Sequence, residues 1–150
     1  MKRFLFFLTF AGVMSMVQAQ TAKDSVMAAV NNLFTAMKSS NGAMLKNCFT
    51  DSAILQTISR NKEGNNVVTS EPINDFADFI NKEEKGNADE QIVFDVVKID
   101  GPLAMVWTPY KFYYKGKFSH CGVNSFQLVK LNGEWKIQYI IDTRRRIGCD

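Results

Sequence analysis

The chain has 150 residues and a formal net charge of +3 at pH 7, and 46% of its residues are hydrophobic. A chain of this length forms one domain with a real core, so neither a metal nor a disulfide is needed to hold it together. The near balance of 18 basic and 15 acidic residues argues against a nucleic-acid-binding protein, because no basic surface dominates.

The N-terminus has the layout of a secretory signal peptide, with a positive start, an apolar stretch and a small-x-small cleavage site. Lys2 and Arg3 precede the apolar stretch, and Ala19 ends the cleavage motif. The apolar stretch is shorter than the roughly 20 residues of a membrane span. We therefore expect a signal peptide at residues 1–19, a periplasmic or secreted mature domain at residues 20–150, and no stable membrane insertion after cleavage.

The three cysteines, Cys48, Cys121 and Cys149, are an odd number. Export would place them in an oxidising compartment where disulfides persist, so at least one of them is left free or pairs between chains. Their spacing matches no zinc pattern, and the sequence does not select a pair.

The first half of the mature chain alternates helical and extended patterns. An amphipathic helix is expected after Thr21, since its apolar residues fall on one stripe: Val26, Val30, Leu33, Phe34 and Met37. A short second helix is expected at residues 43–48, a strand within FTDSAILQTIS, and a turn at residues 62–66. Ser70-Glu71-Pro72 would begin a third helix with one apolar side, Ile73, Phe76, Phe79 and Ile80. Residues 82–90 are expected to form a polar loop.

The last 60 residues contain three two-residue turn signals, Asp100-Gly101, Lys115-Gly116 and Asn132-Gly133. Such dipeptides are typical of tight β-hairpins. They predict an antiparallel meander of four strands near residues 91–99, 102–114, 117–131 and 134–145.

Two-residue loops at all three turns fix a register for this meander. In that register the inward rows hold mostly large apolar residues: Val96, Met105, Phe126 and Tyr139 in one row, with Phe94, Trp107, Asn124 and Ile141 in a neighbouring one. The alternate rows hold smaller, mixed residues. We therefore expect the large residues to face the core, with a bulge near Pro109.

The stretch SHCGVN, residues 119–124, contains His120, the one histidine of the chain, directly before Cys121. Successive side chains of a strand point to opposite faces, so these two cannot share a metal ion or form a Cys/His dyad without a bulge. His120 is expected on the concave face of the sheet. There it either bonds a neighbour such as Asn124, lines a ligand cavity, or acts as a catalytic histidine.

The order of helices and strands, the phrase FTDSAILQT and the ending GEWKIQYIIDTRR resemble the nuclear-transport-factor-2-like superfamily. Within it, VWTPYKFYYKGKFSHCGVNSFQLVKLNGEWKI is similar to exported bacterial proteins called putative lumazine-binding or SnoaL-like. The resemblance implies an α+β fold, a cone-shaped half-barrel in which a curved antiparallel sheet wraps around about three N-terminal helices, as in cystatin-like folds. It does not imply one activity, because this fold hosts several enzymatic and binding functions.

The resemblance also implies a pocket at the wide end of the cone. Such pockets are mostly apolar with a few polar groups, and the expected ligand-binding residues are Trp107, His120, Asn124, Phe126, Tyr139 and Thr143. No metal or other cofactor is indicated.

The general base of ketosteroid-isomerase-like members is not found at the matching position. Aligning Phe49-Thr50-Asp51 with their aromatic-x-Asp phrase places Thr57 where those enzymes have an aspartate. A threonine hydroxyl cannot abstract a proton at neutral pH as a carboxylate can. Asp142 is the nearest other carboxylate, but alternation places it on the outer face.

The outer face of the sheet is expected to be modestly apolar, with Val106, Val123, Ile140, Ser125 and Ala104, and with Tyr110, Phe112 and Tyr114 toward one end. Solvated sheet faces are usually more polar, so we expect a homodimer through this face. Arg144-Arg145-Arg146 is interpreted as a solvated strand end, although alternation would let Arg145 reach the side of His120.

Three functions follow from the sequence, and one of them, an interaction module whose outer sheet face binds a partner protein or a second copy of the chain, is compatible with the first of the other two. The first is an exported protein that binds a small apolar or heterocyclic molecule and has no identifiable catalytic base. The alternative is a cofactor-independent isomerase, dehydratase or cyclase of the SnoaL or ketosteroid-isomerase type that uses His120.

Overall fold

The computed structural model describes the backbone of residues 9–149 and side chains from residue 21 onward. The expected signal peptide at residues 1–19 therefore lies outside the described side chains. The elements follow in the order α1 (Thr9–Lys38), α2 (Gly42–Asn47), β1 (Phe49–Arg60), β2 (Asn66–Ser70), α3 (Ile73–Lys82), β3 (Ala88–Ile92), β4 (Val96–Asp100), β5 (Leu103–Tyr114), β6 (Lys117–Leu131) and β7 (Glu134–Thr143). Among the described residues, no helix combines the length and apolarity that a membrane crossing needs.

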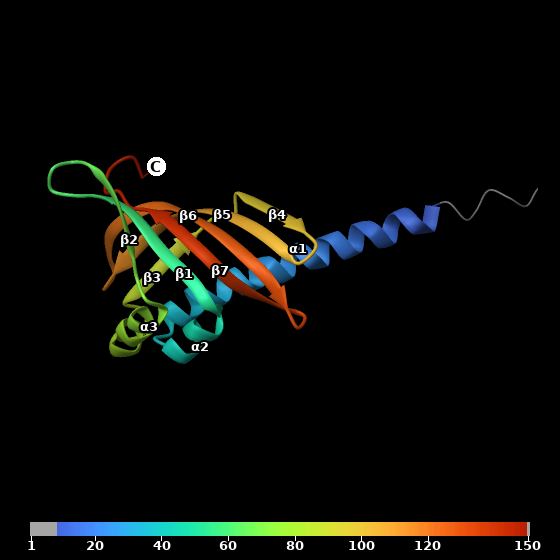
Figure 1. Ribbon diagram of the computed structural model, residues 1–150, viewed down its shortest axis with the longest axis horizontal. Coiled ribbons are helices and arrows are strands. Elements are labelled where there is room, and N and C mark those ends of the chain that lie inside the picture. Colours follow the sequence, from blue (N-terminus) through green and yellow to red (C-terminus); the bar gives the residue numbers. More distant parts are fainter. Residues whose placement is uncertain (1–8, 150) are drawn as a thin grey trace, which may run out of the picture.

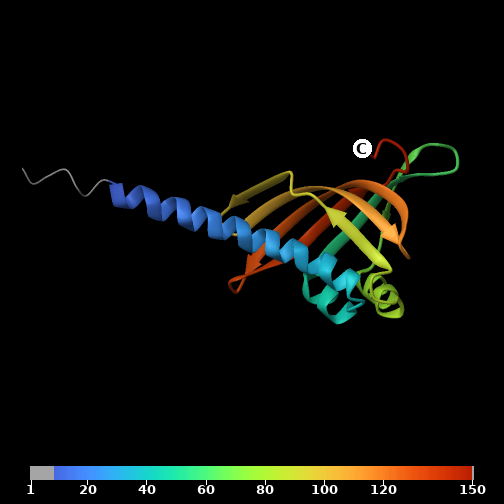
Figure 2. The same ribbon diagram turned by 180° about the vertical axis from the view of Figure 1, so that it is seen from behind.

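The strands form one curved, open sheet with helices on its concave side (Figure 1). The strand order is β2-β1-β7-β6-β5-β3, and β4 pairs with β5 beyond the end of β3. β1 and β7 run parallel, and the other pairs are antiparallel. Figure 2 shows α1 running along the concave side, with α2 and α3 together at one end. The expected α+β architecture is confirmed.

The helical stripe predicted after Thr21 forms the centre of the core. Its members are buried in the second half of α1: Val26, Val30, Leu33, Phe34 and Met37. Phe34 meets Phe126 of β6 edge to face, with 6.1 Å between ring centroids. The apolar side predicted for the third helix faces inward at Ile80, which is fully buried.

The turns predicted at Lys115-Gly116 and Asn132-Gly133 join β5 to β6 and β6 to β7, as expected. Backbone φ is positive at Lys115 and Gly116, and again at Asn132 and Gly133, as tight hairpin turns require. The expected first strand of the meander is divided into β3 and β4, which both pair with β5. The predicted polar loop is shorter than expected, because β3 begins at Ala88, and β2 was not predicted.

The expected faces of β5 and of much of β7 are wrong, because the sheet has two irregularities that the turns do not reveal. Between β5 and β6, Tyr113 pairs with Phe118 but Phe112 pairs with His120, so one extra residue lies in β6. A single extra residue exchanges the inward and outward faces beyond it. As a result Trp107 pairs with Ser125 instead of Asn124.

The exposures of the β5 side chains confirm this reversal. Trp107 and Met105, both expected in the core, are 42% and 37% exposed. Ala104 and Val106, expected outside, are buried in the core. Pro109 pairs with Val123 without a register shift, so the bulge expected there is absent and lies nearer the turn.

The second irregularity lies between β6 and β7. Leu128 pairs with Ile137 but Gln127 pairs with Tyr139, so β7 has one extra residue at this point. Beyond it Ile140 is buried and Asp142 faces the inside, the reverse of the expected arrangement.

Candidate functional site

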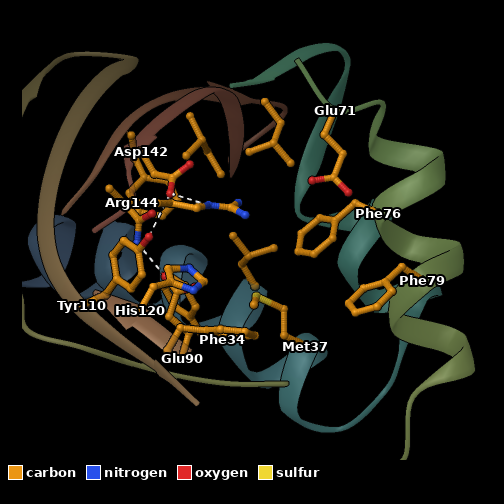
Figure 3. Close-up of a pocket in the computed structure, with 16 residues that line it drawn as sticks. Phe34, Met37, Glu71, Phe76, Phe79, Glu90, Tyr110, His120, Asp142 and Arg144 are labelled. Atoms are coloured by element: carbon orange, nitrogen blue, oxygen red, sulfur yellow. Dashed lines mark hydrogen bonds and ion pairs between the residues drawn. The ribbon is translucent and has the colours of Figure 1, made fainter. Parts of the chain in front are cut away.

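A cavity of about 290 Å³ lies between the helices and the concave face of the sheet (Figure 3). Its apolar wall comes from α1 and α3, with Phe34 and Met37 on one helix and Phe76 and Phe79 on the other. These residues belong to the two amphipathic stripes that the sequence predicted. The opposite wall is the sheet, which contributes most of the polar groups.

The buried polar side chains of the described chain form a single cross-strand row. They are Thr57, Thr108, Asn124 and Asp142. Thr108 pairs with Asn124, Asn124 with Asp142, and Asp142 with Thr57, so the row runs across β5, β6, β7 and β1. A buried polar group without a hydrogen bond is costly, and the row is connected internally and to its neighbours.

Asp142 accepts three hydrogen bonds in this row. The hydroxyl of Thr57 donates to Oδ1 at 2.5 Å. The Tyr110 hydroxyl and Nε of Arg144 donate to Oδ2 at 2.9 and 3.1 Å. Hydrogen bonds to an ionised carboxyl group are among the stronger ones in proteins, so these three bonds fix the position of the Asp142 side chain. Asp142 therefore holds the side chains of Thr57, Tyr110 and Arg144 in place.

Tyr110 keeps its proton in this environment. Burial, reinforced by the negative charges of Asp142 and Glu90, raises the pKa of its hydroxyl above the ordinary value. The hydroxyl also lies 3.0 Å from the carbonyl oxygen of Thr143, a second acceptor. Tyr110 is thus a hydrogen-bond donor at any physiological pH.

Gly122, within the SHCGVN stretch, makes room for this contact. A Cβ atom there would lie 1.7 Å from the carbonyl oxygen of Thr143 and 2.8 Å from the ring of Tyr110. Gly122 pairs directly with Tyr110 across β5 and β6. Glycine is therefore required where β6 passes beneath the tyrosine ring and beside the last residue of β7.

Glu90 is a carboxyl group of the cavity with a raised affinity for protons. Oε1 accepts a hydrogen bond of 2.8 Å from Nδ2 of Asn124. Burial raises the pKa of Glu90 to about 7, although the bond from Asn124 acts in the opposite direction. A carboxyl group with this pKa can both accept and donate a proton near neutral pH.

His120 lies in the same cross-strand row as Glu90. Phe112 pairs with His120 on one side and with Glu90 on the other, and its ring centroid is 5.0 Å from that of His120. Nδ1 of His120 lies 3.0 Å from the Ser119 hydroxyl. Burial and the positive charge of Arg144 lower the pKa of the imidazole, so the ring is neutral at neutral pH.

His120 and Cys121 point to different places, as expected. His120 lines the cavity, whereas Cys121 forms a disulfide with Cys149. Cys48 is free and buried. Among the described residues, no cluster of three or more histidine, cysteine, aspartate or glutamate side chains is arranged to hold a metal ion.

The structure brings together only part of the predicted site. His120, Asn124 and Phe126 line the cavity. Trp107, Tyr139 and Thr143 do not line it, because the two extra residues in β6 and β7 turn them to the other face. The hydroxyl of Tyr139 donates to the side chain of Gln56, and that of Thr143 accepts from the backbone N–H of Val123.

Several cavity residues were missed from the sequence. Tyr110, Phe112 and Asp142 were expected on the outer face, and Glu90 in a polar loop. The arginine that reaches the cavity is Arg144, not Arg145. The available signal was Asp142, a carboxylate that directly follows the apolar residues Tyr139, Ile140 and Ile141 of the last strand.

Comparisons with known proteins agree with this architecture. A family model described as "Putative lumazine-binding" matches residues 21–139. No curated protein matches the sequence.

Several solved structures are similar in fold. An NTF2-like protein of unknown function from Shewanella baltica OS155 has 14% identity and a TM-score of 0.63, covering 83% of this chain and 94% of that chain. A domain of unknown function with a cystatin-like fold from Nostoc punctiforme PCC 73102 has 18% identity and a TM-score of 0.61, covering 83% of this chain and 78% of that chain. A protein described as a putative dehydratase of the NTF2-like family from Streptomyces avermitilis has 15% identity and a TM-score of 0.63, covering 85% of this chain and 98% of that chain. At these identities the likeness shows the fold alone.

Proposed function

We propose that this chain, which belongs to the putative lumazine-binding family of the NTF2-like superfamily, binds a compact, partly apolar heterocycle in the cavity described above. The observation that supports this most is the meeting of an aromatic wall with a buried polar row. The volume of about 290 Å³ is just below the range of roughly 300–1,000 Å³ for small-molecule sites. The cavity therefore favours a small and compact ligand.

The shape and chemistry of the walls favour a flat ring system. Phe34, Phe76 and Phe79 offer ring faces and edges from the helices, and aromatic side chains contact planar rings favourably. On the opposite wall, His120 and Arg144 present nitrogen groups to the edge of a ligand. A heterocycle with an apolar face and hydrogen-bonding edges matches both walls.

The charges of the cavity favour a neutral ligand over an anion. Asp142 already offsets the charge of Arg144. Glu71 and Glu90 also line the cavity. Burial raises the pKa of both carboxyl groups. A multiply charged anion would meet these carboxylates, whereas ring N–H groups could donate to them.

Titration calorimetry with lumazine tests the proposal. The wild-type protein is expected to bind, and His120→Ala and Phe76→Ala to bind more weakly, since both residues line the cavity. Trp107→Ala is the matched control, because Trp107 lies on the opposite face of the sheet. Absence of binding, or a loss confined to Trp107→Ala, would contradict the proposal.

A second candidate function is acid–base catalysis without a cofactor, of the isomerase or dehydratase type. The specific observation in its favour is Glu90, whose pKa of about 7 suits a group that takes a proton and returns it. It shares a row with the neutral imidazole of His120, with Phe112 between them. The base that the sequence lacked at Thr57 is thus available from another strand.

Proton exchange distinguishes catalysis from binding. A bound carbonyl compound incubated in D₂O would gain deuterium next to its carbonyl group if Glu90 removes a proton there. NMR of the compound measures this directly, and Glu90→Gln is expected to abolish the exchange while binding persists. No exchange with any bound compound would leave binding as the function.

We also propose that the chain is exported and cleaved near Ala19. The charged start and apolar run support this, and so does the Cys121–Cys149 disulfide, since such bonds persist in oxidising compartments. N-terminal sequencing of protein recovered from the periplasm or medium of its host tests it. A chain that retains Met1 in the cell interior would contradict it.

We further propose a homodimer through the outer face of the sheet, although four of the residues first assigned to that face are buried: Ala104, Val106, Tyr110 and Ile140. The exposed large apolar residues of β5 are Leu103, Met105 and Trp107, at 50%, 37% and 42% exposure. Exposed apolar groups of this size on one strand support an interface. Light scattering should give twice the chain mass for the wild type and the chain mass for Trp107→Glu, and a monomeric wild type would contradict the proposal.

A further inference from the structure

The C-terminal tail is attached to β6 at two points that share one residue. Beyond β7, the N–H of Arg145 donates to the carbonyl oxygen of Cys121, and the N–H of Cys121 donates to that of Arg145, both at 2.9 Å. Four residues later, Cys149 forms a disulfide with the Cys121 side chain. Cys121 thus holds the tail through its backbone and through its sulfur.

Arg144 is the residue between the end of β7 and this double attachment. Its backbone N–H donates to the carbonyl oxygen of Ile58 in β1 at 3.1 Å. Its side chain turns into the cavity, where Nε donates to Asp142. The Asp142 side chain is 6% exposed and that of Arg144 is 45% exposed, so the pair has one buried and one accessible partner.

The accessible part of Arg144 faces the site of the proposed ligand. Figure 3 shows the guanidinium group extending from Asp142 toward the middle of the cavity, facing the wall that holds Phe76. A guanidinium group has five N–H donors in a fixed plane. Nε is used on Asp142, which leaves the terminal N–H groups directed at the cavity and suited to an oxygen acceptor.

The rest of the tail has weak local contacts. Nε of Arg145 donates to the carbonyl oxygen of Gly148, and Arg146 and Ile147 are exposed. These contacts join the tail to itself and not to the sheet. The disulfide is therefore the strongest attachment of residues 146–149 to the body of the protein.

We propose that the Cys121–Cys149 disulfide positions Arg144 in the cavity, where Arg144 binds a carbonyl oxygen of the ligand. The second half of this inference rests on the proposed binding function, and the first half does not. Breaking the disulfide would free residues 146–149 and weaken the two backbone hydrogen bonds between Cys121 and Arg145. The guanidinium group of Arg144 could then leave Asp142. Cys149 is thus a positioning residue that acts through Arg144.

The positioning half is tested without any ligand by following the Nε–H signal of Arg144 in ¹⁵N-labelled protein. Arg144→Lys assigns the signal by removing it. In the oxidised wild type the signal is expected to be shifted and slow to exchange with water, because this N–H is bonded to buried Asp142. It should move to the position of free arginines in Cys149→Ser and in the wild type reduced with a phosphine.

Ile147→Ala is the matched control, since Ile147 is in the same tail, is 84% exposed and leaves the disulfide intact. This variant should keep the Arg144 signal unchanged. Backbone signals of the sheet report whether Cys149→Ser is folded, and chemical reduction provides the same test without a substitution. A signal that stays in place after reduction overturns the positioning proposal.

The ligand half is tested by the affinities of four proteins for lumazine: wild type, Cys149→Ser, Arg144→Gln and the double variant. If Cys149 acts through Arg144, both single variants bind more weakly and the double variant binds no more weakly than Arg144→Gln. Additive losses, or normal binding by Cys149→Ser, overturn the proposal. A wild type that does not bind lumazine counts against the proposed function. The Nε–H signal of Arg144 still tests, without a ligand, whether the disulfide positions Arg144.

Discussion

The Tyr110 hydroxyl donates to Oδ2 of Asp142 at 2.9 Å although β6 separates the strands to which the two residues belong. The contact crosses directly over Gly122, where a Cβ atom would collide with the backbone of Thr143. The bond joins the aromatic rings of β5 to the buried polar row. The polar wall of the cavity therefore depends on a tyrosine, a glycine and an aspartate from three successive strands of the sheet.

Replacing Gly122 with alanine should destabilise the protein. The obstructing atom is a backbone oxygen at 1.7 Å, so the strands must move apart, and overpacking of this kind costs about 1–3 kcal/mol or more. Urea unfolding measures the change. Gln127→Ala, at an exposed position of the same strand, should change stability by less than about 0.5 kcal/mol. Equal stabilities of the two variants would contradict the close approach.

Tyr110→Phe should also destabilise the fold, by removing a donor from a buried carboxylate. Hydrogen bonds to charged groups contribute about 1.5–3 kcal/mol, and Asp142 would keep Thr57 and Arg144 as donors. The matched control is Tyr113→Phe, because the ring of Tyr113 packs on Phe118 at the hairpin end. If chemical unfolding gave the same midpoint for both variants, the Tyr110 bond would contribute nothing.

Glu90 should make stability depend on pH. Its pKa rises from the ordinary 4.5 to about 7 on folding, so the folded protein holds this proton more tightly than the unfolded chain. The favourable contribution of Glu90 is complete below pH 4.5 and is lost as the pH rises to 7. Relative to Glu90→Gln, the wild type should lose at most about 3 kcal/mol across this window.

Unfolding of both proteins between pH 4.5 and 8 checks this prediction. Glu84→Gln serves as the control, since Glu84 is an exposed residue of the loop before β3, and its curve should run parallel to that of the wild type. A parallel curve for Glu90→Gln would mean that the Glu90 carboxyl group is solvated in the folded protein.

The cysteines should give a defined thiol count. Cys48 is buried and free, and Cys121 is bonded to Cys149. Burial raises the pKa of the Cys48 thiol, so it should react slowly with a thiol reagent while the protein is folded. One thiol per chain should react after unfolding without reductant, and all three after reduction. Three reactive thiols in the unreduced, unfolded chain would exclude the disulfide.

Loss of the disulfide should lower the stability of the fold. The bond closes a loop between residues 28 positions apart, and a loop of this length is expected to contribute about 3.5 kcal/mol through the entropy of the unfolded chain. Chemical unfolding of Cys149→Ser against the wild type measures this contribution. A difference below about 0.5 kcal/mol, the usual limit for surface substitutions, would contradict it.

Elements that depend on local sequence were predictable. The stripe from Val26 to Met37 and the turns at Lys115-Gly116 and Asn132-Gly133 require only nearby residues, and they led to the correct helices and hairpins. The family resemblance supplied the arrangement of these elements, which the local patterns alone do not determine.

The faces of β5 and β7 were not predictable by the same means. Alternation determines which residues share a face only until an extra residue intervenes, and the extra residues in β6 and β7 have no signature in the sequence. Residue size also pointed the wrong way, because Met105 and Trp107 are exposed while Ala104 and Val106 fill the core.

The same two irregularities explain the errors in the site. They turned Trp107, Tyr139 and Thr143 outward and brought Tyr110 and Asp142 inward. His120, Asn124 and Phe126 were placed correctly because they lie on β6 between the irregularities, where alternation is uninterrupted. Glu90 was missed because a short strand was mistaken for a loop.

Ligands are expected to bind at the buried polar row on the concave face and not on the outer face of the sheet. The most direct test is an NMR titration of ¹⁵N-labelled protein with lumazine and a panel of related bicyclic heterocycles. Saturable shifts are expected at Phe34, Phe76, His120, Asn124 and Arg144, with Trp107 and Met105 unchanged. Shifts confined to Trp107 and Met105, or none from any compound in the panel, would contradict this expectation.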